Sequence, residues 1–299
     1  VNKGIASFWS HRGGEAQVGA PWREGRDLKS GVPTVFATAT VGNIVRNWHE
    51  NPLDDQPGSP SGSDLLRRIG TLGEAADLAR LAAFACDDDL PEIIKLKLAA
   101  FGQPMVDRLL SDLMQADFAR ADETADDELF QEKLVSAGFL RLLGDWRRAD
   151  CLAAVVNKFS DAGEPDDLLA DAIRYFLSAV GSPSLPFLIA GIEQKLSDLD
   201  DLDTAGEYML IALTDIAKSG RSDAAFNSLR SAFRKMSRKA IGASCLGDYG
   251  DGRGITVLKG WLDRNPDFTD NQVISEILSA IKRLGGDISD VQNRLRLQR

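Results

Sequence analysis

The sequence repeats itself at a fixed offset of 37 residues between Phe139 and Leu196. FLRLLGDWRRADCLAAVVNKF (139–159) is echoed by FLSAVGSPSLPFLIAGIEQKL (176–196). At this offset several apolar residues and a glycine coincide: Phe139 with Phe176, Gly144 with Gly181, Val155 with Ile192, and Phe159 with Leu196. A period of this length is typical of stacked helical hairpins, each of which buries its apolar face against its neighbours. We therefore expect an all-α chain with about six such hairpins.

Apolar residues at helical spacing divide the hairpins into a helix before each break, called A, and one after it, called B. The A helices are expected at 91–101, 126–143, 165–180, 200–217, 236–247 and 270–284. The B helices are expected at 74–86, 103–115, 145–159, 182–196, 221–235, 253–264 and 287–299. Glycines mark the breaks, and we expect them in the left-handed conformation that closes a helix: Gly102, Gly144, Gly181, Gly220, Gly250 and Gly285. Gly70 and Gly73 are expected to separate a first short helix, 64–69, from the next. Acidic or hydroxyl residues before most A helices predict N-caps.

The first 62 residues differ from the rest of the chain. They are rich in Gly, Pro, Ser and Thr and contain Trp9, Trp22 and Trp48. Only 41–50 has helical spacing, and DDQPGSPSGS (54–63) has the composition of a loop. The sequence therefore predicts an irregular N-terminal arm with one short helix, 1–62, which packs as a cap, followed by the helical array, 63–299.

The break motifs resemble those of the HEAT-like repeat family, in the short form found in phycobilin-lyase-type repeats. There the A helix ends in Leu-Gly-Asp, as at Leu143-Gly144-Asp145, with looser matches at 179–182 and 246–250. The resemblance covers roughly 64–299 and implies an α-α superhelix, or solenoid, whose B helices line the concave surface. The short A helix at 236–247 departs from the pattern because it carries Gly242.

Charge and cysteine content exclude some classes of protein and favour others. The net charge of −10 and a pI of about 4.8 argue against a protein that coats duplex nucleic acid. Cys86, Cys151 and Cys245 are few, widely spaced and set among apolar residues, which favours buried, reduced thiols and a cytoplasmic location. No apolar run approaches the length of a membrane span.

No motif for catalysis, a metal or a cofactor is expected. His49-Glu50 is a single pair, whereas the HEAT-like deoxyhypusine hydroxylases bind iron with several. The acidic stretch 198–207 lacks the spacing of an EF-hand and is interpreted as a linker that caps a helix. The glycine-rich stretch 247–254 has neither the ending of a P-loop nor a strand before it, and is interpreted as a tight turn.

The charges differ between the two kinds of helix. The A helices sum to a negative charge and the B helices to a positive one, which predicts a basic groove if the B helices line a concave surface. The alternative is that these charges are scattered over the surface. The candidate partner-binding residues are Trp146, Arg147, Arg148, Arg221, Arg230, Arg234, Lys235, Arg253 and Lys259, with Arg238, Lys239 and Arg264 nearby.

Two functions follow as hypotheses. The first is a non-catalytic scaffold that binds a protein or peptide with an acidic surface, because arginine and tryptophan commonly anchor interfaces. The alternative is a nucleic-acid-binding protein that resembles the HEAT-like alkylpurine DNA glycosylases, with Asp145 and Trp146 at the lesion. A lyase-like accessory enzyme is a further alternative that rests on the resemblance of fold alone.

Overall fold

The structure is a computed structural model that describes residues 70–85, 92–120, 127–289 and 291. These residues form helices and no strand, apart from one isolated bridge between Ala119 and Pro165. The predicted all-α class is therefore confirmed for this part of the chain. The predicted arm, 1–62, and the helix over 64–69 lie outside the described residues.

The chain divides into two compact units, Val1–Met105 and Val106–Arg299. In the first unit the structure describes helix α4 (Leu72–Ala85), which packs on α5 (Glu92–Ala99). Ala75, Ala79 and Ala82 form a buried row on α4, and Ile94 and Leu98 do so on α5. Gly73 lies within α4, so the prediction that it breaks the helix is wrong. Small residues let two short helices approach closely.

The second unit contains the repeat. It begins within α6 (Gln103–Gln115) and continues through α7 (Asp127–Asp145), α8 (Leu152–Ala162), α9 (Asp167–Val180), α10 (Leu185–Asp198), α11 (Thr204–Ala217), α12 (Asp223–Lys235), α13 (Lys239–Tyr249), α14 (Arg253–Arg264) and α15 (Asn271–Arg283). One 3-10 turn precedes α8 (Ala149–Cys151) and another precedes α10 (Ser182–Ser184). The predicted A and B helices are found here up to α15, within four residues of their expected bounds, except that α8 begins at Leu152 rather than at 145. The helix expected at 287–299 lies mostly outside the described residues.

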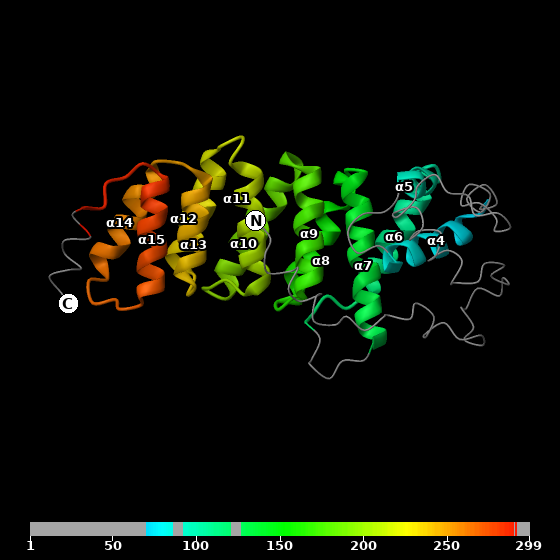
Figure 1. The fold of residues 1–299 in the computed structure, drawn as a ribbon, viewed down its shortest axis with the longest axis horizontal. Helices are drawn as coiled ribbons and strands as arrows, with labels where there is room; N and C mark the ends of the chain where they lie inside the picture. The colour runs from blue at the N-terminus through cyan, green and yellow to red at the C-terminus, as the bar shows by residue number, and fades with distance from the viewer. Residues whose placement is uncertain (1–69, 86–91, 121–126, 290, 292–299) are drawn as a thin grey trace, which may run out of the picture. The chain divides into compact units, whose positions relative to one another are not determined.

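The packing in this unit connects every second helix. Helices α7, α9, α11, α13 and α15, called the A row, pack each on the next. Helices α8, α10, α12 and α14 are called the B row; α8 packs on α10, α10 on α12, and α14 on α13 and α15. Figure 1 shows these helices following one another in chain order from α7 to α15. The two rows therefore form two layers with a shared interior.

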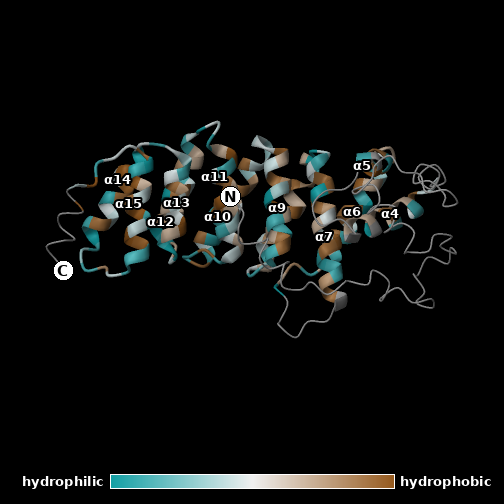
Figure 2. Cartoon of the chain, in the orientation of Figure 1, coloured by the Kyte–Doolittle hydropathy of each residue, from teal (hydrophilic) through white to brown (hydrophobic). Residues whose placement is uncertain are grey.

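The interior is built from the apolar residues that recur along the repeat. Phe139, Phe159 and Phe176 are almost wholly buried, as are Leu196 and Ile192. Figure 2 shows hydrophobic and hydrophilic residues on different parts of the same helices in this unit. This is the expected pattern for amphipathic helices whose polar side faces water.

Carboxylates cap the starts of three A helices as predicted, and a serine caps a B helix, for which no cap was predicted. Asp166 accepts a hydrogen bond from the amide of Leu168 at 3.0 Å, and Asp203 accepts one from Gly206 at 2.9 Å. Asp270 and Ser222 cap α15 and α12 in the same manner. Asp203 lies in the stretch 198–207, so its interpretation as a capping linker is confirmed.

The break glycines divide into two groups. Gly102, Gly181, Gly250 and Gly285 have positive φ, between 62° and 81°, as predicted for glycines that close a helix, although the ψ of −138° at Gly181 lies outside the left-handed helical region. Gly144 lies inside α7 instead, and the left-handed residue of that turn is Arg147, with φ of 50°. A Cβ added at Gly144 would lie 3.1 Å from the Cα of Phe176. Gly144 is therefore needed for the close approach of α7 and α9, and the prediction that it closes the helix is wrong. Gly220 is likewise not left-handed.

Within the described ranges no single helix is long and apolar enough to cross a membrane. Residues Asp167–Val180 and Ser182–Asp198 meet that requirement only as a pair, with a bend of 115° between them.

Candidate partner-binding surface

The predicted partner-binding residues lie on the B row and in the turns that lead into it. Helix α12 buries Phe226, Leu229 and Phe233 on one side. Arg230 and Arg234, one and five residues after Leu229, are therefore turned away from this core. Arg234 is exposed and Arg230 half-buried. Neither side chain forms an ion pair with any residue that the structure describes.

Arg230 has a further unusual feature. Its Nε atom is enclosed by protein atoms, and no acceptor among the described residues lies within hydrogen-bond distance. A buried donor without an acceptor is costly, and most such groups in folded proteins have a partner. The Nε of Arg230 is therefore a buried donor without an acceptor among the described residues.

Other predicted cations are neutralised by neighbouring carboxylates. Arg253 is 2.7 Å from Asp251 and 2.8 Å from Asp223, and its guanidinium lies 4.1 Å from the ring centre of Phe226. Hydrogen bonds from the guanidinium of Arg253 to Asp251, and then those to Asp223, raise the pKa of Arg253. Lys235 is 2.8 Å from Asp200 and also donates to the carbonyl of Leu196. The positive charges of Arg253 and Lys235 are therefore already neutralised by carboxylates of the same unit.

The turn between α7 and α8 holds three more predicted residues. Arg148 forms a two-point contact with Asp150 at 2.7 and 2.9 Å, and that hydrogen bonding raises the pKa of Arg148. Arg147 is exposed, and Trp146, which is half-buried, donates its amide to Leu142. Asp145 accepts a short hydrogen bond of 2.5 Å from the hydroxyl of Tyr175. Asp145 is therefore part of the contact between α7 and α9.

The remaining cations are distributed over α12 to α14. The guanidinium of Arg221 would lie 2.9 Å from a Cβ added at Gly250, and its charge helps to lower the pKa of Asp251 after the larger effect of Arg253. Arg238 is 2.9 Å from the buried carboxylate of Glu207. Lys239 donates to two carbonyls at the end of α12, and burial lowers its pKa. Lys259 is half-buried on α14. Arg264 is exposed at its end and has no ion pair with a described residue.

The structure thus separates the predicted set into two groups. Arg230, Arg234 and Arg264 are the cations of α12 and α14 without a counter-charge in the described part of the chain. Arg148, Lys235 and Arg253 have theirs within 3 Å. Sequence counting treated all these residues alike. Asp150 and Asp251 lie two residues from Arg148 and Arg253, whereas Asp200 is brought to Lys235 by the fold.

Sequence reasoning did not identify three exposed carboxylates on the same row. Asp161 of α8 and Glu193 and Asp198 of α10 are exposed and have no ion pair with a described residue. The signal was present, since Asp161 and Asp198 are 37 residues apart and match at the offset of the repeat.

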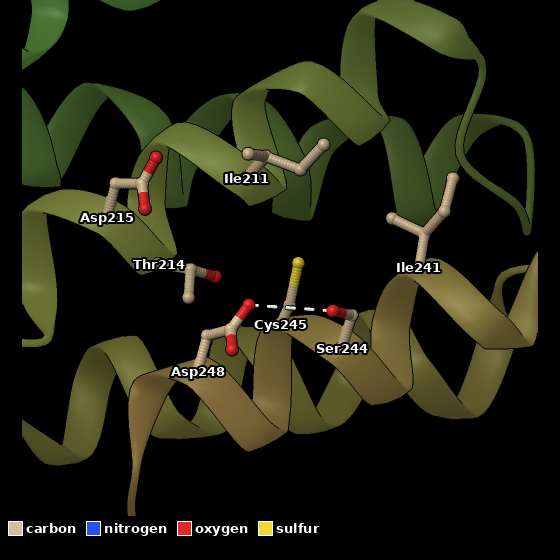
Figure 3. Close-up of a pocket in the computed structure, with 7 residues that line it drawn as sticks. All are labelled: Ile211, Thr214, Asp215, Ile241, Ser244, Cys245 and Asp248. Carbon is tan, nitrogen blue, oxygen red and sulfur yellow. Dashed lines mark hydrogen bonds between the residues drawn. The ribbon is translucent and has the colours of Figure 1, made fainter. Parts of the chain in front are cut away.

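A pocket of about 260 Å³ lies between α11 and α13 of the A row. Figure 3 shows its lining, with Asp215 and Thr214 on α11 and Ser244, Cys245 and Asp248 on α13. Asp215 is paired with Arg174 at 2.9 Å and Lys218 at 3.1 Å, and Asp248 lies 3.4 Å from Arg283. The carboxylates of the pocket are thus already neutralised.

The thiol in this pocket is not activated. Burial raises the pKa of Cys245 to about 12, so the thiol is protonated at neutral pH and is a poor nucleophile. Burial likewise raises the pKa of Cys151 to about 11. The prediction of buried cysteines is confirmed for these two, and Cys86 lies outside the described residues. No group of three or more metal-ligating side chains occurs in the part of the chain that the structure describes.

The glycine-rich stretch 247–254 contains the tight turn interpreted from its sequence, but that turn is only 250–252, since 247–249 end α13 and 253–254 begin α14. Gly250 is left-handed, and Arg253 begins α14.

Neither a protein-family model, nor a curated protein, nor a solved structure matches the chain.

Proposed function

We propose that the unit 106–299 is a HEAT-like α-solenoid and that it acts as a scaffold, without catalysis, by binding a protein or peptide partner on its B row. The alternation of A and B helices and the 37-residue offset support the solenoid. The buried, protonated thiols suit a reducing compartment such as the cytoplasm.

One observation carries the choice of surface and partner. Arg230, Arg234 and Arg264 have no counter-charge among the described residues, although carboxylates are plentiful in this acidic chain. A carboxylate from a partner would supply the counter-charge to these guanidinium groups, and charged hydrogen bonds are the stronger ones. The partner is therefore one with an acidic surface.

A fluorescence-anisotropy titration with a labelled oligo-glutamate peptide tests this function on the full chain. We expect saturable binding that weakens with added salt. The double variant Arg230→Glu/Arg234→Glu should weaken binding by about tenfold or more, given typical exposed charge contacts. The control is Lys282→Glu, a charge reversal at an exposed residue of α15 in the A row, compared with Arg234→Glu alone.

The outcomes separate the hypotheses. Equal loss of binding in Lys282→Glu and Arg234→Glu would show only a general effect of net charge and would contradict the choice of the B row. Binding of duplex DNA with a steep salt dependence and the same sensitivity to Arg230→Glu/Arg234→Glu would favour the nucleic-acid alternative instead.

A further inference from the structure

The helices of the B row can be aligned residue by residue from their buried positions. Buried Leu188, Ile192 and Leu196 of α10 match buried Ala225, Leu229 and Phe233 of α12 at an offset of 37. The three residues of α12 in turn match buried Gly254, Leu258 and Leu262 of α14 at an offset of 29. Equivalent exposed positions on successive helices can therefore be compared directly.

At these equivalent positions the sign of charge changes between α10 and α12. Glu193 of α10 corresponds to Arg230 of α12 and to Lys259 of α14. A second position follows the same order, with carboxylates on α8 and α10 and cations on α12 and α14: Asp161, Asp198, Lys235 and Arg264. At these two positions the B row is thus acidic over α8 and α10 and basic over α12 and α14, whereas the position of Arg234 carries a serine on α8 and α10 and Asp263 on α14.

Most of the exposed charges at these positions have no ion-pair partner among the described residues. Asp161, Glu193 and Asp198 have no ion pair with a described residue, and the same holds for Arg230, Arg234 and Arg264. An acidic region and a basic region on the same row are expected to attract one partner with the opposite order of charges.

The centre of the same surface is uncharged. Two further sets of equivalent positions on α8, α10, α12 and α14 carry only small, hydroxyl or amide residues. The first set is Ala153, Ala190, Asn227 and Thr256, and the second is Asn157, Gln194, Ser231 and Gly260. All are exposed except Gly260, which is half-buried. The amides of Asn157, Gln194 and Asn227 have no hydrogen bond to any described residue. An amide side chain offers both a donor and an acceptor, as a peptide group does. These positions suit the main chain of an extended segment.

We propose that the partner is an extended peptide segment that crosses the B row, with a basic half over α8 and α10 and an acidic half over α12 and α14. This inference rests on the proposed function in taking the B row as the binding surface, and it adds the order of charges in the partner. Packed helices lie about 8–10 Å apart and an extended chain rises about 3.3 Å per residue. Four helices therefore correspond to about ten residues of the segment, or two to three per helix.

The test compares three labelled peptides of about ten residues on the full chain, a length that follows from the same spacings. The mixed peptide has a lysine half and a glutamate half, and the other two are oligo-glutamate and oligo-lysine. We expect the mixed peptide to bind about tenfold more tightly than either of the others, since each exposed charge contact is modest and several must add.

A charge-reversal variant makes the test specific. Glu193→Arg/Asp198→Arg reverses two exposed charges of the acidic region that have no ion-pair partner among the described residues, so the fold should be retained and circular dichroism should show unchanged helicity. This variant should bind the mixed peptide more weakly and oligo-glutamate more tightly than the wild type does. The matched control for Glu193→Arg alone is Glu132→Arg, at an exposed residue of α7 in the A row, which should change neither affinity.

Each outcome bears on a different claim. Equal affinity of the wild type for oligo-glutamate and the mixed peptide would overturn the order of charges and leave the acidic-partner function standing. No binding of any of the three peptides would overturn both proposals. A dimer in sedimentation that dissociates in both Arg230→Glu and Glu193→Arg variants would show that a second copy of the chain occupies the surface, and this too would overturn the peptide proposal.

Discussion

Lys195 of α10 places its ammonium 2.5 Å from the carboxylate of Asp203 and 2.8 Å from the carbonyl of Ser160. Asp203 is the N-cap of α11, and Ser160 lies in the last turn of α8. A single buried lysine thus connects the end of one B helix, the body of the next, and the start of an A helix. Its carbonyl contact satisfies one of the acceptors that every helix end leaves open.

The same contact recurs along the B row. Lys158 of α8, which is 37 residues before Lys195, donates to the carbonyl of Met114 in α6 at 3.1 Å. Lys235 of α12 donates to the carbonyl of Leu196 in α10 at 2.8 Å. Each of these lysines places a positive charge at the C-terminal end of the preceding B helix, where the helix dipole favours it. The contacts tie successive hairpins together.

Replacing Lys195 by methionine should destabilise the unit strongly. The substitution leaves the Asp203 carboxylate without its partner, and breaking a buried ion pair typically costs about 3 kcal/mol or more. Lys158→Met removes a contact with a carbonyl alone and should cost about 1 kcal/mol. Urea unfolding followed by circular dichroism measures both. A Lys195→Met variant no less stable than Lys158→Met would contradict this assignment.

Gly144→Ala should separate α7 from α9. The added methyl would lie 3.1 Å from the Cα of Phe176 and 3.1 Å from the ring of Tyr175, so the helices must shift, at a cost of about 1–3 kcal/mol. Gly252→Ala is the control, because nothing lies within 4 Å of its added Cβ and its φ is −56°. That control should be neutral or slightly stabilising. Equal thermal unfolding midpoints for the two variants would refute the close approach at Gly144.

The carboxyl of Glu207 should make stability depend on pH. Burial raises the pKa of Glu207, although Arg238 at 2.9 Å opposes this effect. A raised pKa means that the folded state binds the proton more tightly than the unfolded state, so stability is lost as the pH rises through the folded pKa. Glu207→Gln should therefore be at least as stable as the wild type near neutral pH, with a difference that disappears in acid. Unfolding curves from pH 3 to pH 8 would show this, and a wild type that gains on the variant with rising pH would contradict it.

The cysteines Cys151 and Cys245 should resist alkylation in the folded protein. Their raised pKa values, about 11 and about 12, leave almost no thiolate at pH 8, and both side chains are buried. In a Cys86→Ser background, mass spectrometry after iodoacetamide treatment should find both thiols unmodified in the folded protein and alkylated once urea unfolds the chain. Rapid modification of Cys245 under native conditions would instead show that the pocket between α11 and α13 opens.

Arg253 and Arg234 should contribute differently to binding of the acidic peptide. Arg253 already contacts Asp251 and Asp223, so Arg253→Gln should change the affinity for oligo-glutamate little. Arg234→Gln removes an open charge and should weaken binding by about two- to fivefold, as expected for an exposed charge contact. Anisotropy titrations at one salt concentration compare the two. A larger loss of affinity in Arg253→Gln than in Arg234→Gln would contradict the assignment of Arg253 as neutralised and Arg234 as available to the peptide.

The sequence by itself determined the helical class, the order of A and B helices and most helix ends. These follow from local physics: apolar periodicity defines a helix, Asp166, Asp203 and Asp270 cap helix starts, and Gly102, Gly181 and Gly250 adopt the positive φ that side chains disfavour. The candidate surface was predicted only as a set of cations on the B helices.

The tertiary structure decided which of those cations are open to a partner. Arg253 has one partner, Asp251, two residues before it in the chain, but its second partner, Asp223, reaches it only through packing. Gly144 and Gly181 occupy the same repeat position, yet only Gly144 lies inside its helix, in contact with the next one. Both distinctions depend on side chains tens of residues away in the chain, which packing of the rows brings within a few ångströms. Contacts of that kind are set by the stacking of helices, and no local pattern encodes them.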